Sequence, residues 1–207
     1  PLVGPFPSGA PAIFIDQIGR LGTPAAIISR VGDDDFGRLN LDRLIADGVD
    51  VSGIAVAKGE TTGSAFVRYR PDGSRAFVYN IAHSATGKLA FTPEAEALME
   101  SCDHMHVMGT ALSAPGLSQV AREAVARITA RGGTLSFDPN LRPEILDTPG
   151  LREALDEVLA QTNLFLPSGE EIYLFTEADD EAAAVKELLD RGVGDIVIKR
   201  GNQGASH

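Results

Sequence analysis

The sequence predicts an α/β protein built on a doubly wound, mostly parallel sheet. Short β-branched runs alternate along the chain with longer runs of helical periodicity, a pattern typical of parallel strands joined by crossover helices. Several strand–helix units of this kind follow one another. A chain of 207 residues is long enough to bury a sizeable core, so we expect a single α/β domain over 1–207.

The first predicted elements are an amphipathic helix, a buried strand and a second helix. A Ser-Gly-Ala-Pro turn leads into the first helix within 6–22. The β-branched run 25–32 predicts a strand, and 34–48 has apolar residues at near-helical spacing before a terminating glycine. By the same criteria we expect later strands at 104–109, 133–140, 163–167 and 195–201, and later helices at 117–133, 150–162 and 181–192.

One stretch, 61–80, breaks this rhythm. Polar and apolar residues alternate on both sides of Pro71-Asp72-Gly73, which predicts a β-hairpin. We expect the hairpin to be a flap over one edge of the sheet. Apolar residues on its alternate face, such as Phe66 and Phe77, are candidates for burial against a second subunit, so we expect a homodimer formed through the hairpin.

Charge and composition exclude several classes of partner. The net charge of −11 would repel nucleic acids and anionic membranes, whereas a small anionic ligand needs only a few basic residues gathered locally. The single cysteine, Cys102, suits a reducing compartment. No apolar run is long enough for a membrane span and no leader is recognised, so we expect a cytoplasmic protein.

Three loops that follow predicted strands carry the candidate chemistry. Asp138, Asn140 and Arg142 follow the strand at 133–140, and Arg142 is suited to hold a phosphate or carboxylate. A loop at the carboxyl end of a parallel strand is where open α/β sheets bind ligands. A turn stiffened by Pro139 and Pro143, with Asp138 capping the next helix, explains the same residues about equally well.

The other two loops have weaker signals. Ser168 is the expected N-cap of a helix whose first turn holds Glu170 and Glu171, and ordinary capping explains these carboxylates as well as metal binding does. Lys199, Gly201 and Gly204 follow the last strand, where glycine amides and a lysine suit a phosphate. Together the three loops predict one site, because they would open on the same sheet edge.

Two groups of residues could in principle bind a metal, but their spacing and position favour structural roles. His104 and His106 share one face of a predicted strand, but no third ligand has suitable spacing. The acidic run at 33–35 precedes a helix and is expected to cap it rather than bind a metal. Neither a Walker phosphate loop nor a Rossmann glycine fingerprint is found.

The chain resembles the ribokinase-like (PfkB) carbohydrate kinases over nearly its whole length. The motifs that carry the resemblance are SGAPAIFIDQIGRLG, ISRVGDDDFGRLNLDRLIADGVDVSGI, TTGSAFV, FDPNLRPEIL, LFLPSGEEIYLFT and IVIKRGNQGA. The chain is most similar to kinases of ketoses or of 2-keto-3-deoxy sugar acids, and GPFPSGAPAIFIDQ resembles tagatose-type kinases. The resemblance implies phosphoryl transfer from ATP, with Mg²⁺, to a primary hydroxyl, and makes the hairpin a lid over the sugar.

The same resemblance implies that both ends of a complete kinase are missing from this sequence. Family members begin with a strand before the glycine turn, and their Gly-Ala-Gly-Asp loop, which carries the catalytic base, would follow the strand that holds Lys199. We therefore expect an internal piece of a longer kinase, with no catalytic base in the chain.

Site residues can be assigned by resemblance at matching positions. Gly9 and Ala10 match the sugar-contacting turn, whereas Ile13 replaces an asparagine of the family. Tyr79 and Asn80 match the lid strand that meets the substrate. In the keto-deoxy acid kinases an arginine follows there, but this chain has Ile81, which favours a neutral ketose such as tagatose over an acid.

The active-site loop and the nucleotide site are assigned in the same way. Asn140 and Arg142 match substrate-binding positions, and Arg142 is the candidate catalytic residue that steadies the transferring phosphate. Glu171 matches the glutamate that helps hold the Mg²⁺ water shell, while Ser168 replaces the family's asparagine. The nucleotide-binding candidates are Ser168, Lys199, Gly201 and Gly204. A 2-keto-3-deoxygluconate kinase and a non-catalytic sugar-binding fragment remain alternatives.

Overall fold

The structure, a computed structural model, describes residues 3–72, 75–142 and 145–207. Gly73 of the predicted turn and Pro143 of the predicted active-site loop lie outside the described residues. The chain forms two compact units. We call Pro1–Leu98 with Ala114–Leu117 the N-terminal unit, and Met99–Ser113 with Ser118–His207 the C-terminal unit. The single domain over 1–207 stays a prediction.

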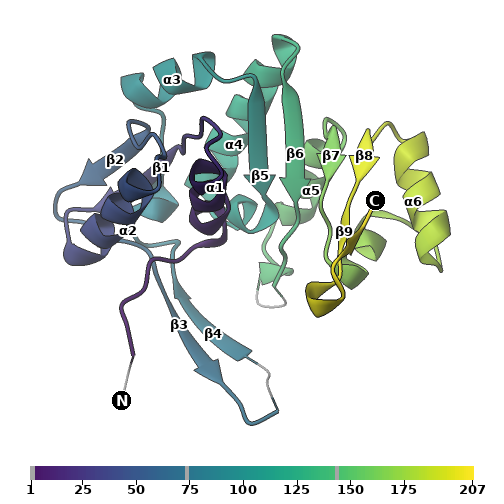
Figure 1. Cartoon of the computed structure of the whole chain (residues 1–207), viewed down its shortest axis with the longest axis horizontal. Helices are drawn as coiled ribbons and strands as arrows, with labels where there is room; N and C mark the ends of the chain where they lie inside the picture. Colours follow the sequence, from purple (N-terminus) through teal and green to yellow (C-terminus); the bar gives the residue numbers. More distant parts are fainter. Residues whose placement is uncertain (1–2, 73–74, 143–144) are drawn as a thin grey trace. The chain divides into compact units, whose positions relative to one another are not determined.

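The N-terminal unit begins with two helices and two parallel strands (Figure 1). The elements are α1 (Ala10–Arg20), β1 (Ser29–Gly32), α2 (Asp35–Ala46) and β2 (Ile54–Ala57). Strand β1 pairs with β2 in parallel, with Ser29 opposite Ile54. The two predicted helices and the first strand are confirmed. The sequence prediction missed β2, although Gly53 and Gly59 bound its short apolar run.

Helix α2 starts at the capping residue Asp34, which confirms the capping role expected of the acidic run. One carboxylate oxygen accepts the N–H of Gly37 at 2.8 Å and the hydroxyl of Thr62 at 2.7 Å, and the other accepts the Thr62 N–H at 2.7 Å. Burial alone would raise the pKa of Asp34, but the hydrogen bonds from Thr62 and Gly37 hold it below its ordinary value. Asp34 thus ties the start of α2 to the segment before the hairpin.

The predicted hairpin is confirmed as β3 (Ser64–Tyr69) paired antiparallel with β4 (Arg75–Asn80). Its register places Phe66 opposite Val78 and Val67 opposite Phe77. Because cross-strand partners share a face and neighbours alternate, Phe66 and Phe77 lie on opposite faces of the hairpin. The prediction that they share one apolar face is therefore wrong: one face presents Phe66 and Val78, the other Val67, Phe77 and Tyr79.

A short 3₁₀ helix and an α-helix follow the hairpin. They are η1 (Thr86–Lys88) and α3 (Pro93–Glu100). Thr92 Oγ1 accepts the N–H of Ala95 at 3.2 Å, which caps the start of α3. The sequence prediction did not include α3, although a threonine followed by proline and glutamate is a helix-start signal.

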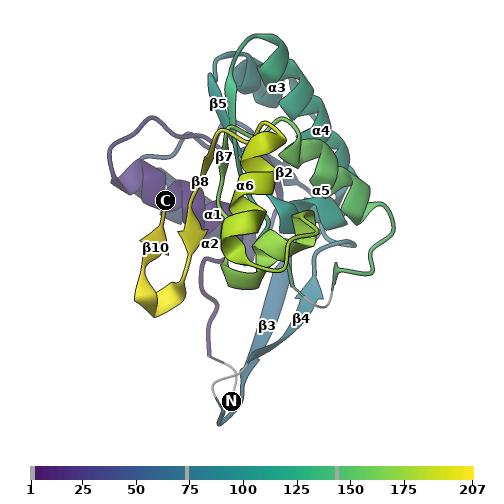
Figure 2. The same cartoon turned by 90° about the vertical axis from the view of Figure 1, so that its right-hand side faces the viewer.

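The C-terminal unit contains a parallel sheet with strand order β5-β6-β7-β8 (Figure 1). The strands are β5 (His104–Met108), β6 (Thr134–Asp138), β7 (Leu164–Phe165) and β8 (Asp195–Ile196). The helical segments that follow its strands are η2 (Gly109–Ser113), α4 (Pro115–Ala130), α5 (Leu151–Leu159), η4 (Gly169–Phe175) and α6 (Glu181–Asp190). Of α4, the part from Ser118 onward belongs to this unit. The chain then pairs β9 (Ile198–Lys199) with β10 (Ala205–Ser206) around η5 (Gly201–Gln203), near the end marked C in Figure 2.

Strand β6 divides the C-terminal unit into an apolar side and a polar side. Leu135 and Phe137 are fully buried in the hydrophobic core, and the Phe137 ring lies 5.7 Å from that of Phe165 and 6.0 Å from that of Phe175. The alternate residues of β6, from Thr134 to Asp138, face the other way. The apolar face therefore anchors the strand while the polar face leads toward the loop that follows it.

The fold class is confirmed as α/β, with a parallel sheet flanked by helices. Within the described part of the chain, no helix combines the length and apolarity that crossing a membrane requires.

Candidate functional site

The loop after β6 has a backbone conformation that few residues adopt. Asn140 has a φ of +41°, in the left-handed region that asparagine tolerates better than most side chains. Asp138 Oδ1 accepts the N–H of Asn140 at 3.1 Å, which closes a turn of the kind that Asp and Asn side chains form. The Asn140 amide also contacts the Met108 sulfur at 3.7 Å. This loop is held by its own polar side chains.

Lys199 joins the third candidate loop to the first. Its ammonium group forms an ion pair with Asp138 Oδ2, and the Asp138 side chain is mostly buried. The Lys199 backbone N–H donates to the Pro167 carbonyl at 2.8 Å, next to Ser168. The expectation that three separate loops meet at one sheet edge is confirmed for these residues, and the Asp138–Lys199 pair is the contact that sequence reasoning missed.

Glu171 joins the second loop to the first. Glu171 Oε1 accepts the N–H of Leu141 at 2.7 Å, and Oε2 accepts the N–H of Ser168 at 2.7 Å. Ser168 is the N-cap of η4, as predicted, with Glu170 and Glu171 in the first turn. Both oxygens of the predicted metal ligand therefore already accept backbone hydrogen bonds.

The remaining candidates of the C-terminal unit lie on the same loops. Arg142 follows Leu141 and is half-buried, and its carbonyl accepts the N–H of Ile145. Gly201 and Gly204 flank the turn between β9 and β10 with φ values of +58° and +88°. Both values lie in the left-handed region, so these glycines are needed for the turn itself, whatever else they bind.

The candidates of the N-terminal unit lie on two different elements. Gly9 is the N-cap of α1 with a φ of +101°, and Ala10 is the first residue of that helix. Tyr79 and Asn80 lie at the end of β4, where the Tyr79 ring stacks on that of Phe77 at 5.4 Å. All four residues are partly or largely exposed. Within this unit the predicted sugar-binding residues are therefore accessible but belong to separate elements.

A second polar group on β5 and β6 was not recognised as a network from the sequence. Ser136 Oγ lies 2.8 Å from His104 Nε2 and 2.8 Å from His106 Nδ1, and His104 Nδ1 lies 2.7 Å from Thr134 Oγ1. Burial, with smaller contributions from His104 and Lys199, lowers the pKa of His106 to about 4. The available sequence signal was that polar and apolar residues alternate in both HMHVM and TLSFD. The parallel register of β5 and β6 then places His106 opposite Ser136.

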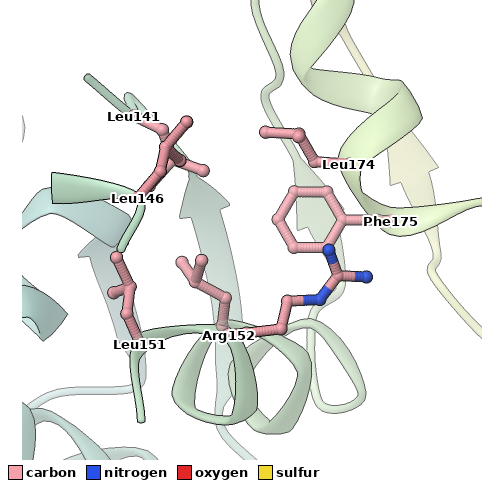
Figure 3. A pocket seen from close by; sticks show the side chains of 7 residues that line it. Leu141, Leu146, Leu151, Arg152, Leu174 and Phe175 are labelled. Atoms are coloured by element: carbon pink, nitrogen blue, oxygen red, sulfur yellow. The ribbon is translucent and has the colours of Figure 1, made fainter. Parts of the chain in front are cut away.

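An apolar cavity of about 280 Å³ lies beside the loop after β6 (Figure 3). Leu141, Leu146, Leu151, Arg152, Leu155, Leu174 and Phe175 line it. The Arg152 guanidinium lies 5.8 Å from the centre of the Phe175 ring. Arg152 is the one polar side chain in this lining and already pairs with Asp156 at 3.0 Å, while the other lining side chains are apolar. We therefore place the candidate sugar and phosphate contacts at the polar loops instead.

No cluster of three or more His, Cys, Asp or Glu side chains suited to a metal occurs among residues 3–72, 75–142 and 145–207. Mg²⁺ is commonly held by only one or two carboxylates, with water and substrate phosphates completing its shell. Each Glu171 oxygen has a second lone pair beyond its backbone hydrogen bond, so a contact to metal-bound water fits this carboxylate.

The fold and these loops define an α/β protein with three polar loops joined at the carboxyl edge of a parallel sheet. Residues 6–207 match the pfkB family carbohydrate kinases, and the chain belongs to that family. It is 33% identical over 186 residues to a fructokinase of Klebsiella pneumoniae, covering 89% of this chain and 60% of the relative. The chain thus spans less than two thirds of that relative's length.

Two solved structures extend the similarity. One is an Escherichia coli protein provisionally named ribokinase II, in complex with ATP and Mg²⁺: it is 46% identical, with a TM-score of 0.91 over 100% of this chain and 67% of that one. The other is a Vibrio cholerae fructokinase with fructose, ADP and a calcium ion: it is 26% identical, with a TM-score of 0.80 over 96% of this chain and 64% of that one. The resemblance to PfkB kinases is confirmed, whereas the tagatose-type assignment is not tested.

Proposed function

We propose that the protein carrying this chain is an ATP- and Mg²⁺-dependent kinase that phosphorylates a primary hydroxyl of a ketose. The observation that carries the proposal is the convergence of three loops through Asp138, Lys199 and Glu171. This convergence gives the loop with Asn140 and Arg142 a defined shape at the carboxyl edge of the sheet. Membership of the carbohydrate kinase family supports the same reaction.

We assign candidate contacts to the sugar within each unit taken by itself. Gly9 and Ala10 would contact it from the start of α1, and Tyr79 and Asn80 from the end of β4. Asn140 and Arg142 would contact it from the loop after β6. Hydroxyl groups need hydrogen-bonding partners when water is excluded. These positions offer backbone amide groups, the phenol of a tyrosine, the side-chain amides of two asparagines and the guanidinium of an arginine.

We assign ATP to Ser168, Lys199, Gly201 and Gly204, and the Mg²⁺ water shell to Glu171. ATP with Mg²⁺ supplies the phosphoryl group, whose bond to the ADP oxygen breaks as a bond to the sugar oxygen forms. Arg142 would stabilise the negative charge on the transferring group, and closure of the β3–β4 hairpin would exclude competing water. Proton removal from the sugar hydroxyl is not assigned to a residue of this chain.

The substrate we favour is a neutral ketose such as tagatose or fructose. Ile81 follows Asn80, so the end of β4 offers no cation there for a sugar carboxylate, and a buried carboxylate without a partner is costly. The Klebsiella relative is named a fructokinase, which supports a ketose. A 2-keto-3-deoxygluconate kinase is the alternative enzyme, and a sugar-binding fragment without activity is the other alternative.

We also propose a homodimer formed through the hairpin. The face with Phe66 and Val78 supports this, because these side chains are 52% and 68% exposed. Sedimentation of the wild type and of Phe66→Ser tests it: a dimer that becomes a monomer is expected. A monomeric wild type would exclude the dimer.

The function is tested by measuring ADP release with tagatose, fructose and 2-keto-3-deoxygluconate, with Mg²⁺ or with a chelator. We expect Mg²⁺-dependent turnover with a ketose and a roughly 100-fold lower kcat in Arg142→Ala, since one lost donor to a transition-state charge costs about that much. Arg122→Ala is the control, because Arg122 forms an exposed pair with Glu157. Faster turnover of the sugar acid would establish the alternative enzyme, and sugar binding without ATP consumption would establish the fragment.

A further inference from the structure

We propose that Glu171 is a positioning residue whose carboxylate holds the loop with Asn140 and Arg142 in its binding shape. The catalytic consequence of this role rests on the kinase function proposed above. The hydrogen bonds themselves do not depend on that function, and they can be tested separately.

The Glu171 carboxylate joins two loops that lie far apart in the sequence. Its two oxygens each accept a backbone N–H at 2.7 Å, one from Leu141 after β6 and one from Ser168 after β7. These distances are at the short end for N–H···O hydrogen bonds, as expected for an ionised acceptor. A single side chain therefore bridges the two loops.

The backbone that carries Glu171 is firmly anchored. Glu171 lies in η4, whose next residue, Ile172, is fully buried, and Phe175 at the end of η4 is 2% exposed. The Phe175 ring packs edge-on against that of Phe165 at 5.4 Å. Because the core holds η4, the carboxylate is a fixed reference point for the loop that it contacts.

Leu141 is held from two directions. Its side chain lines the apolar cavity with Leu174 and Phe175 (Figure 3) and packs against the core. Its N–H donates to Glu171. The peptide group between Asn140 and Leu141 consequently has little freedom to rotate. This peptide directly follows Asn140 and lies one residue before Arg142, so fixing its orientation restricts the directions in which these two candidate substrate residues project.

The Asp138–Lys199 pair secures the other end of the same loop. Asp138 accepts the N–H of Asn140, and its second oxygen pairs with Lys199. Asn140, which has the left-handed φ of +41°, therefore lies between two carboxylate anchors, Asp138 before it and Glu171 through the next residue. Surrounding hydrogen bonds of this kind can maintain a conformation that a free loop would rarely adopt.

A positioning role and a metal role predict different responses to substitution. Glu171→Asp keeps the negative charge but is one methylene shorter, so it cannot reach both N–H groups in the same place. Glu171→Gln keeps the length but loses the charge and presents an amide N–H₂ to one of the two donors. A role in the Mg²⁺ shell depends mainly on charge, whereas positioning depends on both length and acceptor number.

The experiment compares the wild type with Glu171→Asp and Glu171→Gln, with Glu170→Gln as the control. Glu170 is the exposed neighbour in the same turn of η4, so its change removes the same charge without touching the two N–H groups. Amide hydrogen exchange at Leu141 and Ser168 is measured by NMR. Sugar phosphorylation is measured over a range of Mg²⁺ concentrations.

We expect both Glu171 variants to exchange the Leu141 amide about tenfold faster and to lose about tenfold in kcat. In Glu171→Asp, which keeps the charge, the half-saturating Mg²⁺ concentration should stay within about twofold of wild type, whereas Glu171→Gln should also need more Mg²⁺. Glu170→Gln should match the wild type. Unchanged protection of Leu141 in Glu171→Gln would overturn the proposal, as would a raised Mg²⁺ requirement with kcat retained. If the wild type phosphorylates no sugar, the proposed function fails, and the exchange data alone decide whether Glu171 holds the loop.

Discussion

His106 makes the stability of this protein depend on pH in a direction that the structure defines. Burial beside Ser136, near His104 and Lys199, lowers the pKa of His106 from 6.5 to about 4. The unfolded chain therefore binds a proton more readily than the folded one. This contribution to stability is fully present above about pH 6.5 and is lost as the pH falls toward 4.

The size of the effect follows from the two pKa values. Below both pKa values the loss would approach about 3 kcal/mol, and between about pH 7 and pH 5 it amounts to roughly 2 kcal/mol. Other groups titrate over the same range, so the measurement compares the wild type with His106→Asn. Asparagine has no ionisable group and places a polar atom near the Nδ1 position, within reach of Ser136.

Urea unfolding at a series of pH values provides the assay. We expect the wild type to lose about 2 kcal/mol more than His106→Asn between about pH 7 and pH 5. Parallel curves over the whole range would refute the reasoning, because they would show that His106 has the same proton affinity in the folded and unfolded chains.

Two further predictions concern the core and the cap of α2. Phe165→Ala should lower the free energy of unfolding by about 3–5 kcal/mol, because Phe165 is fully buried among aromatic rings, whereas Leu189→Ala on an exposed position should cost less than about 1 kcal/mol; similar urea midpoints would contradict this. Asp34→Ala should cost about 2–4 kcal/mol by removing the cap and leaving the Thr62 N–H without its acceptor. Asp35→Ala, at a side chain that is 92% exposed, should cost less than about 1 kcal/mol, and equal losses would rule out the capping argument.

Local patterns account for most of the fold that was predicted. The helical spacing in α2, α4, α5 and α6 and the alternation in the hairpin are properties of short segments, so the sequence alone was sufficient for them. The missed elements, β2 and α3, are short and have weak periodicity. The error over Phe66 and Phe77 has a different origin. The antiparallel register between β3 and β4 decides which of their residues share a face, and that register cannot be read from either strand alone.

The sequence by itself determined the class of protein and the positions of the polar loops after the strands. Chain order and residue type suffice for this, since parallel strands bring their carboxyl ends to one edge. Only the tertiary structure decided what those residues bind: Asp138 pairs with Lys199, and Glu171 accepts two backbone N–H groups. These contacts depend on distances of a few ångströms between loops about 30 to 60 residues apart. Such distances are set by how the core packs, which local sequence patterns do not encode.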